Sequence, residues 1–115
     1  MIVAPEVKVF LATGVTDLRK SINGLSALVE EEMSLSPFTG AIFGFCNRKR
    51  DLIKLLYWDR NGFALWMKRL EKDHFNWPDS ANFRLELTGR ELRWLLDGLM
   101  LESRSFGKLN YESAG

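Results

Sequence analysis

Cysteine and histidine are scarce in this sequence, which contains one of each, Cys46 and His74. A single cysteine excludes a disulfide within the chain and any site with several cysteine ligands. A zinc site built from this chain alone is not expected either, because such sites take most of their ligands from cysteine and histidine. Gly40 and Gly44 lack the spacing of a phosphate-binding loop. We therefore predict neither a metal nor any other cofactor.

Long apolar runs are absent as well. No segment approaches the length of a membrane-spanning helix, and no charged-then-apolar leader precedes a cleavage site. We therefore expect a cytoplasmic protein without a membrane partner. With 115 residues, of which 46% are hydrophobic, the chain is long enough for one modest core. We predict a single domain over residues 1–100 and a flexible tail over residues 101–115, where no periodicity is evident.

The stretch from Gly40 to Pro78 carries the strongest pattern in the chain. Three apolar, aromatic-rich runs are separated by two short polar loops, at residues 47–51 and 59–62. Apolar runs divided by turn residues predict a three-stranded antiparallel meander. Because Asn-Gly favours a type I′ turn, we predict a two-residue loop at Asn61–Gly62.

This turn sets the predicted register of the second and third strands. Arg60 faces Phe63, and Lys54 faces Arg69, so two like charges are opposed. Side chains alternate across a strand, which divides the hairpin into two faces. One face carries Lys54, Leu56, Trp58, Leu65, Met67 and Arg69, and the other carries Leu55, Tyr57, Ala64, Trp66 and Lys68. Both faces are apolar in the middle, which predicts a sheet that is covered on both sides or meets a partner on one.

Strands and a helix are predicted before and after the meander. Residues 7–12 and 83–87 alternate in hydropathy, which is typical of strands. A helix is predicted from about Thr16 to Met33, because its apolar residues recur at helical spacing. Thr16 or Asp17 is expected to cap this helix, since either side chain can accept a hydrogen bond from a first-turn N–H.

A second helix is predicted near the end of the chain. Thr88 is followed three residues later by Glu91, and this spacing matches a capping box at the start of a helix. The predicted fold class is therefore α+β, with an antiparallel sheet of four or five strands that includes the meander and packs with two helices.

Positive charge is concentrated in the meander, although the whole chain is nearly neutral. Residues 47–72 contain eight basic and three acidic residues, whereas the remainder contains eight basic and twelve acidic residues. We expect these cations to gather at one end of the sheet, where they could bind a polyanion. The residues predicted to contact DNA phosphates are Arg48, Lys49, Arg50, Lys54, Lys68, Arg69 and Lys72. A solvated loop that protects the sheet from aggregation explains the same pattern, and the residues alone favour that explanation.

Residues with catalytic potential are scattered along the chain. Asp17, Asp51 and Asp59 could form a carboxylate metal site for phosphoryl transfer, but the predicted register puts Asp51 and Asp59 at opposite ends of one strand. His74 lacks a paired carboxylate, so a partly buried structural histidine is the better interpretation. Arginines near Cys46 could lower the pKa of its thiol, yet no neighbouring base is evident. We predict no catalytic residue and no enzymatic activity.

Large aromatic residues are frequent in and after the meander. Four tryptophans and Tyr57 could stack on nucleic-acid bases, but core packing accounts for most large aromatics in a small domain. Tyr57, Trp58 and Trp66 are the residues that we predict for protein interaction, on an exposed aromatic face of the meander.

Three longer segments of the sequence form a recognisable pattern. They are NRKRDLIKLLYWDRNGFALWMKRLEKDHFNWP in the meander, LATGVTDLRKSINGLSALVEE near the start and LTGRELRWLLDGL near the end. Together they resemble the small TnpB-type accessory protein of the insertion-sequence-66 family, over roughly residues 7–99. This family is distinct from the RNA-guided nucleases that share the TnpB name. The chain departs from the family pattern at Cys46, where relatives often have a basic residue, and at Asp73–His74, which replaces a more usual Gly-Arg pair.

The resemblance implies a protein encoded in a bacterial transposable element beside a larger transposase, which carries the strand-cutting chemistry. It implies a non-catalytic accessory role in transposition. We expect the chain to help a transposase complex assemble on element DNA, through phosphate contacts that carry no sequence specificity. The alternative is a protein-interaction module that binds the transposase without contacting DNA, either as a monomer or as a homodimer. A metal-dependent nuclease built on three carboxylates ranks behind both.

Overall fold

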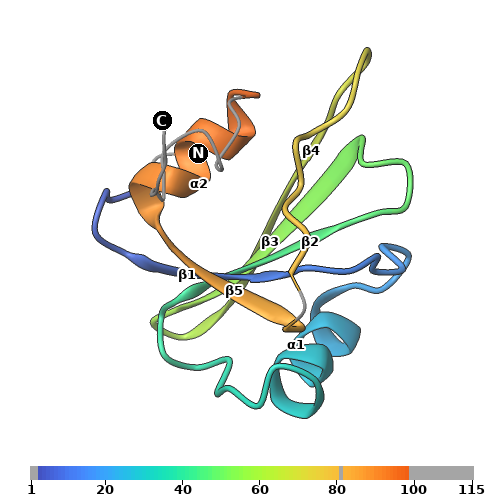
Figure 1. Ribbon diagram of the computed structural model, residues 1–115. Coiled ribbons are helices and arrows are strands. Elements are labelled where there is room, and N and C mark those ends of the chain that lie inside the picture. Colours follow the sequence, from blue (N-terminus) through green and yellow to red (C-terminus); the bar gives the residue numbers. More distant parts are fainter. Residues whose placement is uncertain (1–2, 81, 99–115) are drawn as a thin grey trace.

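The computed structural model describes residues 3–80 and 82–98 of the chain (Figure 1). Five strands and two helices make up these residues. In chain order they are β1 (Lys8–Ala12), α1 (Ile22–Glu31), β2 (Ile42–Cys46), β3 (Leu52–Asp59), β4 (Gly62–Arg69), β5 (Arg84–Thr88) and α2 (Gly89–Leu96). The predicted domain boundary at residue 100 and the predicted tail lie outside the described residues.

The five strands form one mixed sheet in the order β4-β3-β2-β1-β5. The predicted antiparallel meander is formed by β2, β3 and β4, and β5 pairs antiparallel with β1. In contrast, β1 and β2 are parallel, which corrects the prediction of a purely antiparallel sheet. The helix α1 connects β1 to β2. A helical crossover returns the chain to the end of the sheet where the first strand began, so the two strands run in parallel. The α+β class is confirmed.

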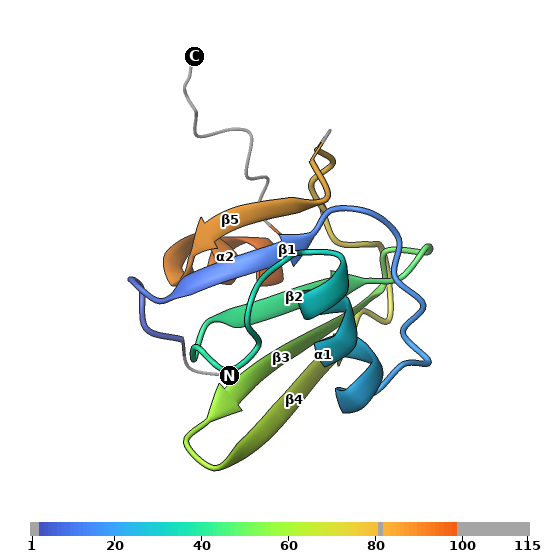
Figure 2. The same cartoon turned by 90° about the horizontal axis from the view of Figure 1, so that it is seen from below.

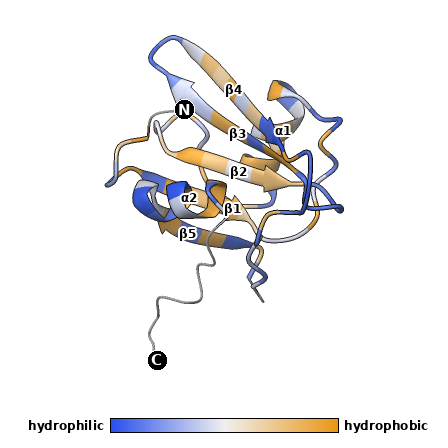
Figure 3. Cartoon of the chain, turned by 90° about the horizontal axis from the view of Figure 1, so that it is seen from above, coloured by the Kyte–Doolittle hydropathy of each residue, from blue (hydrophilic) through white to orange (hydrophobic). Residues whose placement is uncertain are grey.

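Apolar side chains cover both faces of the sheet. Figures 2 and 3, which view the molecule from opposite sides, show α1 over one face and α2 over the other. The buried residues on the α1 side are Ala12, Leu18, Leu25, Val29, Met33, Ala41, Phe43, Phe45 and Leu56. Because strand residues alternate, Phe43 and Phe45 face α1, whereas Ile42 and Cys46 face α2. The sheet is therefore covered on both sides, which was one of the two predicted arrangements.

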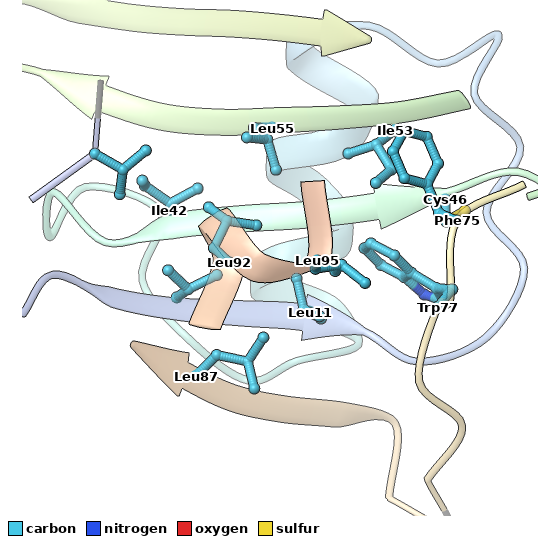
Figure 4. Packing of buried hydrophobic residues seen from close by; sticks show 12 residues of the cluster. Leu11, Ile42, Cys46, Ile53, Leu55, Phe75, Trp77, Leu87, Leu92 and Leu95 are labelled. Carbon is cyan, nitrogen blue, oxygen red and sulfur yellow. The ribbon is translucent and has the colours of Figure 1, made fainter. Parts of the chain in front are cut away.

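Two aromatic residues from an irregular segment close one end of the core beneath α2. Figure 4 shows Phe75 and Trp77 beside the leucines of α2. The Trp77 indole N–H donates a hydrogen bond to the Ala12 carbonyl over 2.9 Å. Gly44 leaves room for this packing, because a Cβ at that position would lie 2.6 Å from a methyl carbon of Leu11 and 3.4 Å from the Trp77 ring. The segment that follows β4 thus joins the fold through buried aromatic rings.

The first helix, Ile22–Glu31, is shorter than the predicted helix from Thr16 to Met33. The Thr16 N–H donates to the Cys46 carbonyl over 2.9 Å, which attaches this part of the chain to the end of β2. The Asp17 carboxylate accepts hydrogen bonds within its own turn instead of capping the helix. Contact with the sheet therefore delays the start of α1, and both predicted caps are wrong.

The turn between β3 and β4 differs from the predicted one. Arg60 and Asn61 form the loop, and Gly62 pairs with Asp59, so every cross-strand pair is displaced by two residues. Arg60 has a φ of 56°, whereas Asn61 is not among the described residues with positive φ. A type I′ turn needs positive φ at both central positions, so that prediction is wrong. A displacement of two residues keeps each side chain on its predicted face.

The observed register brings apolar side chains together across the hairpin. Trp58 pairs with Phe63, and their ring centroids lie 5.1 Å apart. Lys54 pairs with Met67, so the predicted opposition of Lys54 and Arg69 is also wrong. An aromatic cross-strand pair contributes roughly 0.2–1 kcal/mol, which offsets the preference of Asn-Gly for the two central positions of the turn.

The second helix begins as predicted. The Thr88 hydroxyl oxygen accepts a hydrogen bond from the Glu91 N–H over 3.2 Å, and the Glu91 carboxylate accepts one from the Thr88 N–H over 2.9 Å. This reciprocal pair confirms the capping box. Over residues 3–80 and 82–98, neither helix is long and apolar enough to cross a membrane.

Candidate nucleic-acid interface

The loop between β2 and β3 is a closed turn with two exposed cations at its tip. The Asn47 side-chain oxygen accepts hydrogen bonds from the N–H groups of Asp51 and Leu52, each over 3.1 Å. The Asn47 amide also donates to the Asp51 carboxylate over 2.7 Å. These bonds hold the two ends of the loop together, so Arg48 and Lys49 are directed into solvent.

This loop borders a hollow of about 940 Å³ at one end of the sheet, which we call the basic hollow. The other walls are the segment before α1 and the last residue of β4. The lining residues are Val15, Thr16, Asp17, Leu18, Arg19, Asn47, Arg48, Lys49, Asp51, Leu52 and Arg69. Four of them are basic and two are acidic, so the formal charge of the lining is 4 − 2 = +2.

Asp17 and Arg19 form a tight ion pair on the rim of the basic hollow. The Arg19 N–H and Nε donate to Asp17 Oδ1 over 3.0 and 2.9 Å, and Arg19 Nη2 donates to Asp17 Oδ2 over 2.7 Å. These hydrogen bonds lower the pKa of the Asp17 carboxyl to about 2 and raise the pKa of Arg19. The carboxylate therefore stays ionised at neutral pH, and the bound guanidinium cancels its charge.

Three cations of the basic hollow remain available to a ligand. Within residues 3–80 and 82–98, no hydrogen bond or ion pair engages the side chains of Arg48, Lys49 or Arg69. All three are exposed, as is Lys72, which follows β4 but does not line the hollow. The structure therefore brings together three of the seven predicted DNA-contacting residues around one hollow.

Arg50 has a different environment from its two neighbours in the loop. Its Nη1 donates to the Trp77 carbonyl over 2.6 Å, and its Nη2 lies 3.3 Å from the Asp79 carboxylate. The Arg50 carbonyl in turn accepts a hydrogen bond from the Phe75 N–H over 2.7 Å. Arg50 thus holds the segment around Trp77 against the β2–β3 loop, and it is not among the residues that line the basic hollow.

Lys54 and Lys68 also bind backbone carbonyls, on opposite faces of the sheet. On the α1 side, Lys54 Nζ donates to the carbonyls of Leu18 and Lys20 over 2.7 and 3.0 Å. On the α2 side, Lys68 Nζ donates to the Leu96 carbonyl over 3.2 Å at the end of α2. Their placement follows from side-chain alternation and ties each helix region to the sheet.

The three predicted protein-interaction residues are divided between the two faces. Tyr57 and Trp66 pack against the core beneath α2. Trp58 lies on the other face, at the end of the hairpin opposite to the basic hollow, where it contacts Phe38 and Phe63 with ring centroids 5.2 and 5.1 Å apart. We call these three rings the aromatic cluster. The sequence interpretation missed Phe38, which is 54% exposed; an aromatic residue in a loop of serine, proline and threonine was the available signal.

Comparison with known families shows the family of the chain. The family model described as "IS66 Orf2 like protein" matches residues 7–105. The chain belongs to the IS66 Orf2-like family. Its membership confirms the resemblance found in the sequence and supports a transposition-associated accessory role.

Two curated relatives come from Sinorhizobium fredii. The uncharacterized protein y4hO is 34% identical over 93 residues, which are 81% of this chain and 81% of that protein. The uncharacterized protein y4jC is 34% identical over 92 residues, which are 80% of this chain and 79% of that protein. No solved structure matches the chain significantly.

The other reactive residues of this IS66 Orf2-like protein are dispersed. Cys46 is buried, and burial raises the pKa of its thiol to about 12 although Arg50 acts in the opposite direction. His74 is exposed, so the prediction of a partly buried histidine is wrong. Asp51 directly precedes β3 and Asp59 is its last residue, so the two carboxylates lie at opposite ends of the strand, as predicted. Among the residues that the structure describes, no three histidine, cysteine or carboxylate side chains are grouped to hold a metal ion.

Proposed function

We propose that this chain is a non-catalytic accessory protein that helps a transposase complex assemble on element DNA, and that it contacts DNA phosphates at the basic hollow. The single observation that carries the proposal is the presence of three exposed cations around one hollow, Arg48, Lys49 and Arg69, with no polar partner in the described residues. Family membership supplies the transposition context.

The chemistry of these side chains suits phosphate. Arginine presents a planar fork that can donate two hydrogen bonds to one phosphate, and lysine adds a mobile point charge. The Asp17 carboxylate would repel a phosphate, but the Arg19 guanidinium already neutralises it. The remaining lining carboxylate, on Asp51, accepts a hydrogen bond from the loop itself. The free cations therefore dominate the field at this end of the sheet.

Phosphate contacts of this kind would give affinity without sequence preference. Backbone contacts fix the position of a protein on the duplex, whereas recognition of sequence requires contacts with base edges. An accessory protein that increases the affinity of a transposase complex for DNA needs only the first of these. Lys72, which is exposed three residues after the end of β4, would extend the same surface.

Charge reversal around the basic hollow tests the proposal. Arg48→Glu, Lys49→Glu and Arg69→Glu are each expected to weaken binding to an element-end duplex at low salt. The matched control is Arg60→Glu, which makes the same charge change on a side chain that is 94% exposed at the other end of the hairpin. Equal affinities for the Arg60 variant and the three hollow variants would contradict a localised interface. Circular dichroism spectra would verify that all four variants are folded.

The aromatic cluster supports a second candidate function, in which the chain binds the transposase without contacting DNA. Its rings lie at the end of the hairpin away from the basic hollow, and Phe38 is 54% exposed. Apolar contacts are little affected by salt, whereas contacts between exposed charges are screened. Under this alternative, Phe38→Asp abolishes a salt-resistant complex with purified transposase, whereas Phe83→Asp, at a 39% exposed position outside both surfaces, does not. Equal retention of both variants would remove this candidate.

A further inference from the structure

The two edges of the sheet are built differently. β4 forms one edge and has eight residues, all in continuous register with β3. Its first six residues, 62–67, carry no charge and include no proline. β5 forms the other edge, has five residues and carries exposed charges at Arg84 and Glu86. Figures 2 and 3 show β4 along the outer border of the sheet from both sides.

Edge strands of monomeric proteins are usually protected. Short length, charged side chains, proline and bulges all discourage a second strand from pairing with the unpaired N–H and C=O groups of an edge. β5 is short and charged. In β4 the charges are confined to Lys68 and Arg69 at the end of the strand, and residues 62–67 contain no proline and pair with β3 without a bulge. The most exposed large apolar residue of the described chain, Met67, lies on this same strand and is 62% exposed. These features are typical of a strand that has a partner.

We infer that β4 pairs with β4 of a second copy of this chain, antiparallel and about a two-fold axis near the middle of the strand. This pairing would join two five-stranded sheets into one continuous sheet. It does not depend on DNA binding, and it concerns the edge of the sheet rather than the face that carries the aromatic cluster.

The distribution of charge along β4 makes an antiparallel second copy the fitting occupant. With the axis at Trp66, Met67 lies opposite the partner's Leu65, and Lys68 lies opposite the partner's Ala64. Arg69 then lies opposite the partner's Phe63, so no two cations are opposed. A parallel, in-register pair would instead put Lys68 and Arg69 beside their own copies, which is unfavourable. The strand is therefore complementary to itself in the antiparallel direction.

Sedimentation equilibrium of the full chain, without DNA, tests the inference. We expect the wild-type chain to have twice the monomer mass at micromolar concentration. Met67→Lys, a change at an exposed position, adds the kind of charge that protects natural edges and is expected to raise the dimer dissociation constant by about tenfold or more. Phe83→Lys makes the same change at a 39% exposed apolar residue beside the opposite edge of the sheet and should leave the mass unchanged.

Thiol cross-linking distinguishes the β4 edge from other surfaces. The native Cys46 is buried, so the wild-type chain provides a background with little cross-linking. Leu65→Cys is expected to yield a covalent dimer with a short bifunctional thiol reagent, because the two copies of position 65 lie close to the axis. Glu86→Cys, on the opposite edge, should remain uncrosslinked.

Three results for this chain alone would overturn the inference. They are a wild-type chain that stays monomeric at all concentrations, a dimer that survives Met67→Lys but not Phe83→Lys, and a cross-link at position 86 rather than 65. A monomeric chain that instead pairs with a transposase through β4 would also overturn it, because the occupant would then be a different protein.

Discussion

Basic residues of this chain perform two different tasks, and their contacts distinguish them. Arg50, Lys54 and Lys68 each donate to backbone carbonyls where a segment crosses the sheet or a helix ends. At the end of α2 the last carbonyls lack intrahelical donors, so Lys68 both satisfies the Leu96 carbonyl and interacts favourably with the helix dipole. Arg48 and Lys49 have no such contact within the described chain and remain available. A count of charges along the sequence therefore overestimates the number of cations that are available to a polyanion.

Replacement of Arg50 tests its structural role. Arg50→Ala removes the donor to the Trp77 carbonyl and the pair with Asp79, so we expect the free energy of unfolding to fall by about 1–3 kcal/mol. The neighbouring Lys49→Ala should change it by no more than about 0.5 kcal/mol, because its side chain is exposed. Urea denaturation measures both. Identical midpoints for the two variants would show that the contact with Trp77 does not stabilise the fold.

The Asp17–Arg19 pair makes a prediction about pH. The pKa of Asp17 is lowered to about 2 from its ordinary value of 3.8, mainly by hydrogen bonds from the Arg19 side chain. A lowered pKa means that the pair stabilises the folded state above pH 3.8 and that this contribution is lost as pH falls through about 2. An NMR titration of the carboxyl carbon should give a midpoint near 2, and Arg19→Gln should move it upward. An unchanged midpoint in the variant would contradict this assignment.

At the scale of elements, close backbone approach fixes the start of α2. The Gly89 N–H donates to the Val7 carbonyl over 2.9 Å, and a Cβ at residue 89 would clash with the Ala4 carbonyl oxygen. The segment from Val3 to Val7 therefore packs directly on the helix start. Only glycine fits there without displacement of the backbone.

Substitution at this point is expected to be costly. Gly89→Ala should lower the free energy of unfolding by about 1–3 kcal/mol or more, because the clash is with backbone rather than with a flexible side chain. Gly14→Ala is the matched control, since a Cβ at residue 14 meets nothing within 4 Å. Thermal denaturation compares the two variants. A Gly89 variant as stable as the Gly14 variant would refute the close approach.

The sequence predicted correctly those features that depend on residues close in sequence, and it missed those that depend on contacts between distant segments. Local patterns predicted the meander and the Thr88–Glu91 capping box, because both depend on residues close in sequence. The start of α1 was missed, since the Thr16 N–H bonds to Cys46 on β2. The hairpin register was missed because pairing of Trp58 with Phe63 outweighed the local preference of Asn-Gly. The parallel β1–β2 pair was missed although the predicted order of strand, helix and strand already contained the crossover that produces it.

The candidate site was predicted in part for the same reason. Arg48 and Lys49 occupy a turn, where exposure can be inferred from the local sequence. The contacts of Lys54 and Lys68 depend on the face of the sheet and on which helix covers it, and Arg50 depends on a segment that returns from Trp77. The exposure of Phe38 likewise depends on how its loop lies over the hairpin.

On the scale of the whole molecule, the β3–β4 hairpin separates two surfaces of different chemistry. The basic hollow lies at the end where Arg69 leaves β4, and the aromatic cluster lies at the turn that follows Asp59. Because the helices cover the faces of the sheet, the exposed surfaces to which we assign partners are these two ends and the β4 edge. In the proposed function, the basic end contacts DNA while the other surfaces remain available to protein partners.

The most direct test is the affinity of the purified chain for a labelled element-end duplex, measured over a range of salt concentrations. Each phosphate contact contributes about −0.9 to the slope of log K against log salt, so contacts by Arg48, Lys49 and Arg69 predict about −2.7, and a fourth by Lys72 predicts about −3.6. A slope in this range, reduced in the Arg48→Glu variant, is the expected result. Absence of binding at low salt, or binding that does not vary with salt, would contradict the account.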